Sequence, residues 1–180
     1  MTDPVSDLVI RPEPFTSPTA RALTAAVNEV YRQRYGGVDE TPIEDDEFDP
    51  AAGGGFLVGL LAGEPVACVG FRRAEPPAAP GTAEMKRMYV AESARRRGFG
   101  RRLLAALEDA VRAAGYTDLV LDTGTEQPEA IALYESSGYT RIPNYSIYQD
   151  SPLNRAYAKH LDTVAGWQTS PARPSSSPPA

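Results

Sequence analysis

The feature that most constrains the fold is a glycine-bearing turn between a strand-like segment and an amphipathic helix. Residues 84–90 (EMKRMYV) alternate as a core strand does. Residues 95–100 (RRRGFG) follow, and apolar residues then recur at helical spacing, at Leu103, Leu104, Leu107, Ala110, Val111 and Ala114. Such a turn exposes backbone N–H groups and the positive end of the helix dipole. The pattern therefore predicts a binding site for a polyphosphate group.

The residues around the glycines exclude the two common nucleotide-binding loops. A P-loop requires Lys and then Ser or Thr after its last glycine, whereas Gly100 is followed by Arg101 and Arg102. A dinucleotide-binding fingerprint requires a third glycine where this chain has Leu103. The arginines around the turn add planar, permanently charged donors for phosphate oxygens. A different phosphate-bearing ligand is indicated.

The remaining periodicity predicts one α/β domain built on a mixed sheet. Ser17 and Pro18 mark the start of a helix that ends near Gly36, a second helix begins near Gly98, and a third spans residues 128–137. Strand-like runs occupy residues 8–11, 56–61, 66–72, 84–90, 118–123, 139–142 and 153–161. We expect the last of them at the end of the sheet. Residues 1–7 are expected to be flexible, residues 8–164 to form the domain, and residues 165–180 to form a disordered Pro/Ser-rich tail.

Composition limits the partners and the location. A net charge of -6 over 180 residues offers no broad positive field for nucleic acid or an anionic membrane surface. No apolar run approaches the roughly 20 residues that span a bilayer, and the N-terminus lacks the pattern of a signal peptide. Cys68 is the single cysteine, so no internal disulfide forms, and we expect it in the core. These features favour a cytoplasmic location, and no Cys/His spacing suggests a metal site.

Two blocks of the sequence together resemble a known family. Residues 95–100 fit the pattern Gln/Arg-x-x-Gly-x-Gly/Ala, the acyl-CoA loop of the GNAT (Gcn5-related) N-acetyltransferase superfamily. Residues 130–139 (AIALYESSGY) resemble that family's Ala-x-x-Leu-Tyr-Glu-x-x-Gly-Tyr signature and follow the loop at the family's spacing. The resemblance covers residues 56–148. It implies the GNAT acyl-CoA N-acyltransferase fold, a mixed and mostly antiparallel sheet flanked by helices, with acetyl-CoA as co-substrate and no metal.

The resemblance also implies which residues hold acetyl-CoA. In this family the strand before the loop separates from its neighbour at a bulge, and its free backbone groups pair with the pantetheine arm. The matching residues here are Met88 and Val90, and the Met88 N–H is the candidate donor to the thioester oxygen as it gains negative charge. Gln127 stands where many members have an asparagine that contacts the pantetheine. The pyrophosphate is expected on Arg95, Arg96, Arg97, Gly98, Phe99, Gly100 and Arg101.

Two residues are candidates for proton transfer. Tyr134 matches the family tyrosine that protonates the departing thiolate, with packing of its ring as the alternative. Glu84 occupies the position at which a subset of the family has its general base. Because an ordinary glutamate pKa of about 4.3 makes a weak base, this role requires burial or a water relay. The alternative is a glutamate that faces solvent or pairs with Lys86 or Arg87.

The expected reaction is direct attack of a primary amine on acetyl-CoA in a ternary complex. A small-molecule acceptor is favoured, and a protein N-terminus or lysine is one alternative; a non-catalytic acyl-CoA-binding module is another. Residues 39–49 (DETPIEDDEFD), which lie where the family covers its acceptor, carry seven acids that either attract a cationic amine or form a solvated loop. Tyr145 and Tyr148 are candidate walls of the same cleft, His160 is expected to be structural or solvent-facing, and a homodimer is one option for the assembly.

Overall fold

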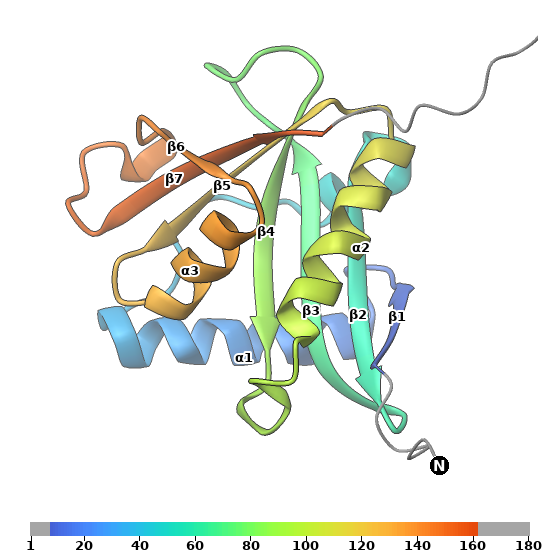
Figure 1. Ribbon diagram of the computed structural model, residues 1–180. Helices are drawn as coiled ribbons and strands as arrows, with labels where there is room; N and C mark the ends of the chain where they lie inside the picture. The colour runs from blue at the N-terminus through green and yellow to red at the C-terminus, as the bar shows by residue number, and fades with distance from the viewer. Residues whose placement is uncertain (1–7, 162–180) are drawn as a thin grey trace, which may run out of the picture.

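The computed structural model describes residues 8–161 as a seven-stranded sheet with helices on both faces (Figure 1). The predicted flexible N-terminus and the predicted disordered tail lie outside these residues. The strands are β1 (Leu8–Pro12), β2 (Gly55–Leu61), β3 (Glu64–Arg73), β4 (Thr82–Val90), β5 (Asp118–Gly124), β6 (Thr140–Ile142) and β7 (Asn154–His160). The α-helices are α1 (Pro18–Tyr35), α2 (Phe99–Ala113) and α3 (Pro128–Ser136). The α/β class with a mixed sheet is confirmed.

The strand order is β1-β2-β3-β4-β5-β7-β6. Among the described strands β4 and β5 form the single parallel pair, and every other pair is antiparallel. The prediction that the last strand lies at the end of the sheet is wrong, because β7 is inserted between β5 and β6. The seven-residue β7 pairs along the whole of β5, whereas β6 has three residues. The longer strand satisfies more backbone groups in the interior position, which leaves the short strand at the edge.

Helix α1 begins and ends at the capping residues predicted from the sequence. The Ser17 hydroxyl accepts a hydrogen bond from the Ala20 N–H at 3.1 Å, and the helix ends at Gly36 with φ of 75°. The acidic segment that follows forms no α-helix. It contains one short 3-10 helix, Asp45–Phe48, whose Phe48 ring is buried while its acids remain at the surface or in ion pairs.

Two apolar clusters lie on opposite faces of the sheet. On one face, α2 buries Leu103, Leu104 and Leu107 against the strands, and α3 lies beside it (Figure 1). On the other face, α1 packs together with the aromatic rings of Phe15, Phe48 and Phe56. Cys68 belongs to this second cluster and is fully buried, as expected, and burial raises the pKa of its thiol to about 12.

Candidate active site

The site begins where β4 and β5 separate. The two strands pair over three positions only, from Thr82↔Asp118 to Glu84↔Val120. Beyond Glu84, no residue of the described β4 pairs with β5. On its other edge β4 changes register against β3, since Lys86 pairs with Gly70 and Tyr89 pairs with Cys68. The extra residue is accommodated by a bulge at which Arg87 adopts φ of 60°.

A cavity of about 410 Å³ fills the gap between the separated strands. Its walls come from β4, the loop before α2, the start of α3, and α1. Ten predicted site residues line it, namely Met88, Val90, Arg95, Arg96, Gly98, Phe99, Gly100, Arg101, Gln127 and Tyr134. Arg97 and Glu84 are the two that do not. Tertiary structure therefore brings together residues from three separate parts of the sequence.

The loop before α2 has the backbone geometry of an anion site. Arg96 and Gly98 both adopt left-handed φ values, 59° and 77°, so that the loop curls and presents its amides on a concave side. A Cβ built on Gly98 meets no atom within 4 Å, so the space above this residue is open. The first turn of α2 contains no acid, and its leading N–H groups have no partner within the helix. These features fit a pyrophosphate.

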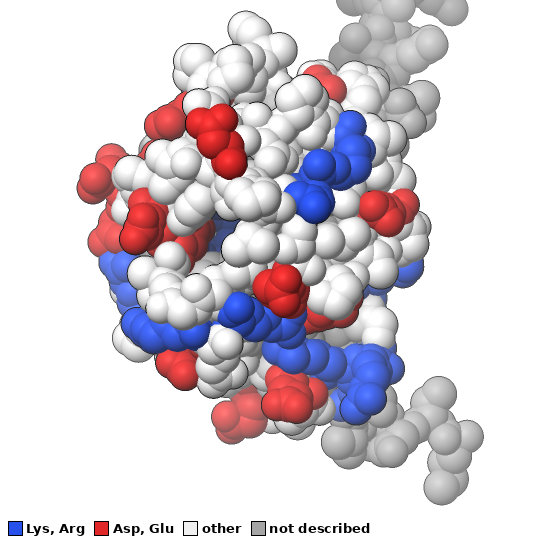
Figure 2. All heavy atoms as spheres, turned by 90° about the vertical axis from the view of Figure 1, so that its left-hand side faces the viewer, with Lys and Arg blue, Asp and Glu red and all other residues white. Residues whose placement is uncertain are grey.

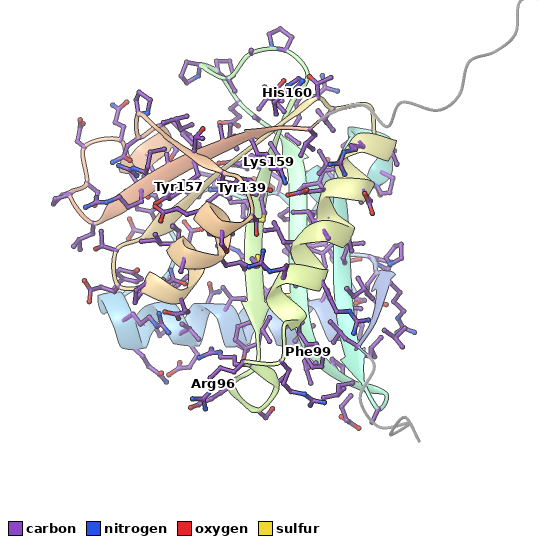
Figure 3. The ribbon with its side chains drawn as sticks, viewed as in Figure 1. Arg96, Phe99, Tyr139, Tyr157, Lys159 and His160 are labelled. Carbon is purple, nitrogen blue, oxygen red and sulfur yellow. The ribbon has the colours of Figure 1, made fainter. Side chains whose placement is uncertain are left out.

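The arginines of the loop have different surroundings. Arg95 donates from Nε to the Val90 carbonyl at 2.9 Å, and Arg101 donates to the Ser136 hydroxyl at 2.9 Å. Arg97 stacks its guanidinium over the Phe99 ring at 4.8 Å, outside the cavity. Figure 3 shows Arg96 and Phe99 at the end of the molecule where α2 begins, with His160 at the opposite end of the sheet. Figure 2 shows basic side chains gathered along the lower part of one face, at the height of this loop in Figure 1.

Tyr134 lies at the inner wall of the cavity. Its hydroxyl points toward β4 and is 3.7 Å from the Met88 sulfur. The side chain is buried, with its ring against those of Tyr139 and Tyr157. Burial raises the pKa of the phenol, and the nearby Tyr31 and Asp122 act in the same direction. The phenol is therefore protonated at neutral pH and available as a hydrogen-bond donor.

Glu84 is buried within a row of ion pairs that crosses the sheet. Its carboxylate contacts Arg72 at 3.0 Å and Lys86 at 3.1 Å. Arg72 continues the row to Glu47 at 2.8 Å, and Lys86 continues it to Asp122 at 2.9 Å. Burial lowers the pKa of Lys86, but the carboxylates of Asp122 and Glu84 outweigh this effect and leave the pKa raised. Of the five members, Lys86 and Asp122 reach the cavity wall.

A second cavity of about 230 Å³ adjoins the first. The two share five lining residues, Tyr31, Asp39, Asp122, Thr123 and Gln127. Of the seven acids in residues 39–49, Asp39 alone lines either cavity, and it contacts the Arg87 guanidinium at 2.5 Å and the Tyr148 hydroxyl at 3.1 Å. Burial raises the pKa of Asp39, but Arg87 and then Lys86 outweigh it, so that the pKa lies below its usual range.

The sequence analysis did not select several residues that line these cavities. Tyr31 and Asp122 were missed as site residues, because one reads as an apolar helix position and the other as a polar residue within a strand. Tyr148 lines the second cavity as expected, whereas Tyr145 lies outside both. His160 is exposed, with Nδ1 at 2.9 Å from the Asp118 carboxylate, and lines neither cavity. Within residues 8–161 no helix is long and apolar enough to cross a membrane, and no group of three His, Cys, Asp or Glu suits a metal ion.

Comparison with known proteins shows the same fold and the same sequence blocks elsewhere. The model of the acetyltransferase (GNAT) family matches residues 23–139, more than half of the chain. An IAA acetyltransferase from Azospirillum brasilense is 42% identical over 81 residues, which are 45% of this chain and 53% of that protein. N-acetyltransferase family 8 member 2 from Rattus norvegicus is 33% identical over 100 residues, 56% of this chain and 41% of that protein. The chain thus matches about half the length of these relatives.

Solved structures agree along most of the chain. An acyl-CoA N-acyltransferase structure from Klebsiella pneumoniae has a TM-score of 0.71 at 29% identity, and the match covers 87% of this chain and 99% of that one. A Salmonella typhimurium acetyltransferase, solved with acetyl-CoA as its cofactor, has a TM-score of 0.59 at 22% identity, with 91% and 99% covered. The second likeness bears on the fold alone.

Proposed function

The chain belongs to the acetyltransferase (GNAT) family, and on this basis we propose that it transfers an acetyl group from acetyl-CoA to the primary amine of a small molecule. The observation that carries the proposal is the first cavity, in which the curled loop, the part of β4 that does not pair with β5 and the Tyr134 hydroxyl surround one space. The acetyl-CoA held by the Salmonella structure of the same fold supports the choice of donor.

The charges on the cavity wall suit this donor. Six cationic residues line the first cavity, namely Arg34, Lys86, Arg87, Arg95, Arg96 and Arg101, against three acids, Asp39, Asp122 and Glu129. We assign the pyrophosphate to the concave amides from Arg95 to Arg101, where Gly98 leaves open space. We assign the pantetheine arm to the backbone of Met88 and Val90 beyond the last β4–β5 pair, with Gln127 beside it.

We propose Tyr134 as the proton donor to the departing sulfur. Its hydroxyl faces β4 at Met88, next to the backbone assigned to the pantetheine arm, and the phenol carries its proton at neutral pH. The Met88 N–H is proposed to stabilise the thioester oxygen as that atom gains negative charge. The neutral amine attacks the thioester carbon directly and forms a tetrahedral oxyanion. The carbon–sulfur bond then breaks and the sulfur leaves as the CoA thiol with the Tyr134 proton, while the amine nitrogen releases one proton to solvent, from which the phenol is reprotonated.

The base role of Glu84 remains a prediction. The carboxylate does not line the cavity, and it is engaged in ion pairs with Arg72 and Lys86. A proton released by the amine can reach the Glu84 carboxylate by two routes. One is a chain of water molecules, and the other passes through Asp122, which lines the cavity, and its contact with Lys86. The cytoplasmic location and the homodimer also remain predictions.

Substitution of Tyr134 by phenylalanine tests the mechanism. We expect Tyr134→Phe to lower kcat by about 100-fold or more, because a positioned general acid contributes about that factor. The dissociation constant of acetyl-CoA, measured by calorimetry, should change little, since the ring remains. The matched control is Tyr157→Phe, which removes a hydroxyl bonded to Glu135 at 3.0 Å outside both cavities. An unchanged kcat in Tyr134→Phe would remove this residue from the mechanism.

An acceptor panel tests the function as a whole. Acetyl-CoA and the protein are mixed with small amines, amino acids and peptides, and release of free CoA is followed. Turnover on small amines supports the proposal. Turnover on peptides alone favours a protein acceptor, and tight binding of acetyl-CoA without any turnover favours a non-catalytic acyl-CoA-binding module.

A further inference from the structure

The second cavity differs in character from the first. Its described lining contains two carboxylates, Asp39 and Asp122, and no lysine, arginine or histidine. The first cavity, by contrast, is lined by twice as many cations as acids. Because the two share five lining residues, a ligand in the second cavity lies next to the reacting end of a donor in the first. Asp39 and Asp122 are paired with Arg87 and Lys86, and these two cations line the first cavity but not the second. The acidic side of both pairs therefore lies at the second cavity, which suits a cation there and a polyanion in the first.

Three aromatic rings stand beside the polar residues Thr123, Gln127, Ser151 and Asn154 in the rest of the second cavity. The rings of Tyr31, Tyr35 and Tyr148 line it. Tyr35 packs directly against the backbone of Gly124, where a Cβ would lie within 1.9 Å of the phenol oxygen, so the wall depends on glycine at that position. Such rings attract both an apolar group and a cation over their faces.

The mouth of the cavity is unusually apolar. Four large hydrophobic side chains are exposed among the described residues, and two of them, Val38 (40%) and Leu153 (49%), line this cavity. A third, Ile147, is the sequence neighbour of the lining residue Tyr148. The fourth, Val9, lies on β1. Apolar side chains that gather at the rim of a pocket indicate an apolar ligand.

One buried donor in the lining of the second cavity is unpaired. Asn154 lines the second cavity and is 6% exposed, yet its amide Nδ2 has no hydrogen-bond partner among residues 8–161. Buried polar groups are rarely left unpaired unless they serve a site. The cavity volume of about 230 Å³ lies below the range of about 300–1,000 Å³ that holds drug-sized molecules, which indicates a small occupant.

We propose that the second cavity binds the acceptor, and that the acceptor is a primary amine attached to an apolar group of aromatic size. The ammonium enters between Asp39 and Asp122, which places its nitrogen at the boundary with the first cavity, and the apolar group lies among the three tyrosines and the rim. This assignment rests on the proposed acetyl transfer and specifies its substrate class.

The test compares amines that differ in one property. The probes are 2-phenylethylamine, butylamine, spermidine and alanine, each with saturating acetyl-CoA, with free CoA as the readout. We expect kcat/KM for 2-phenylethylamine to exceed that of each other probe by tenfold or more. Preference for spermidine or alanine overturns this inference and leaves the acetyl transfer intact. Turnover on none of the four amines overturns the inference together with the proposed function.

A substitution at the rim tests whether the acceptor binds in the second cavity. Val38→Lys places a cation at the mouth on an exposed position, and we expect KM for 2-phenylethylamine to rise roughly three- to fivefold, the size of an exposed charge contact. Acetyl-CoA affinity should not change. The matched control is Val9→Lys on β1, which is more exposed and away from both cavities. Equal KM values in the two variants would place the acceptor elsewhere.

Discussion

Removal of the Lys86 charge is the most informative perturbation of the buried row of ions. The ammonium lies 3.1 Å from Glu84 and 2.9 Å from Asp122, and the three side chains are 4%, 4% and 9% exposed. Lys86→Met keeps the length of the side chain and leaves two buried carboxylates without their shared cation. Glu84 keeps Arg72, but Asp122 retains only a hydroxyl contact with Ser146 at 3.4 Å.

The expected loss of folding stability follows from the unpaired charge of Asp122. Breaking a buried ion pair by removal of one partner costs about 3–5 kcal/mol, and the lower end applies because Arg72 still compensates Glu84. We therefore expect a loss of about 3 kcal/mol in the free energy of unfolding. For a protein of this size, that loss lowers Tm by roughly 6–12 °C.

Urea unfolding followed by circular dichroism measures this effect. The midpoint should fall while the m-value is unchanged. The control is Arg32→Met, which removes an exposed pair with Glu29 at 3.3 Å and should cost less than about 1 kcal/mol. Adding Asp122→Asn to Lys86→Met should recover at least about 1 kcal/mol, since the orphaned charge is removed. A loss below 1 kcal/mol in Lys86→Met, or no recovery in the double variant, would refute the reasoning.

Two further predictions concern the loop and alkaline pH. Gly98→Val should abolish measurable acetyl-CoA binding in calorimetry, while the circular dichroism spectrum is retained. The physical reason is that a β-branched residue is strained at φ of 77° and that its side chain enters the open space above the loop. Retained binding would show that the pyrophosphate does not bind to this loop. Stability in urea should be constant from pH 7 to about 8 and then fall as pH rises, because the raised pKa values of Cys68, Tyr134 and Lys86 stabilise the fold below their unfolded values of 9.0, 10.0 and 10.5 and this contribution is lost above them. A flat profile to pH 11 would contradict these shifts.

Much of the proposed acetyl-CoA site could be predicted from short sequence patterns. The loop from Arg95 to Arg101 depends on residues that are adjacent in sequence, and its glycine, arginines and following helix carry their own conformational preferences. Tyr134 was identified by a second local block. The structure places both on one cavity. The position of β7 was mispredicted because strand order depends on long-range pairing, which no local periodicity encodes.

The second cavity, in contrast, was decided by tertiary structure. Its carboxylates come from the loop after α1 and from β5, its rings from α1 and the 3-10 helix near Tyr148, and its buried amide from β7. The lining comes from three separate stretches, residues 31–39, 122–127 and 148–154, so neither spacing nor composition predicted their meeting. For Glu84, pairing with Lys86 was one of the alternatives from sequence, but the contact with Arg72 and the buried row of ions appeared only once β3, β4 and β5 were aligned. Sequence alone determined the loop proposed for the donor because the chemistry of that loop is local. Folding determined the cavity proposed for the acceptor because its residues are assembled across the sheet.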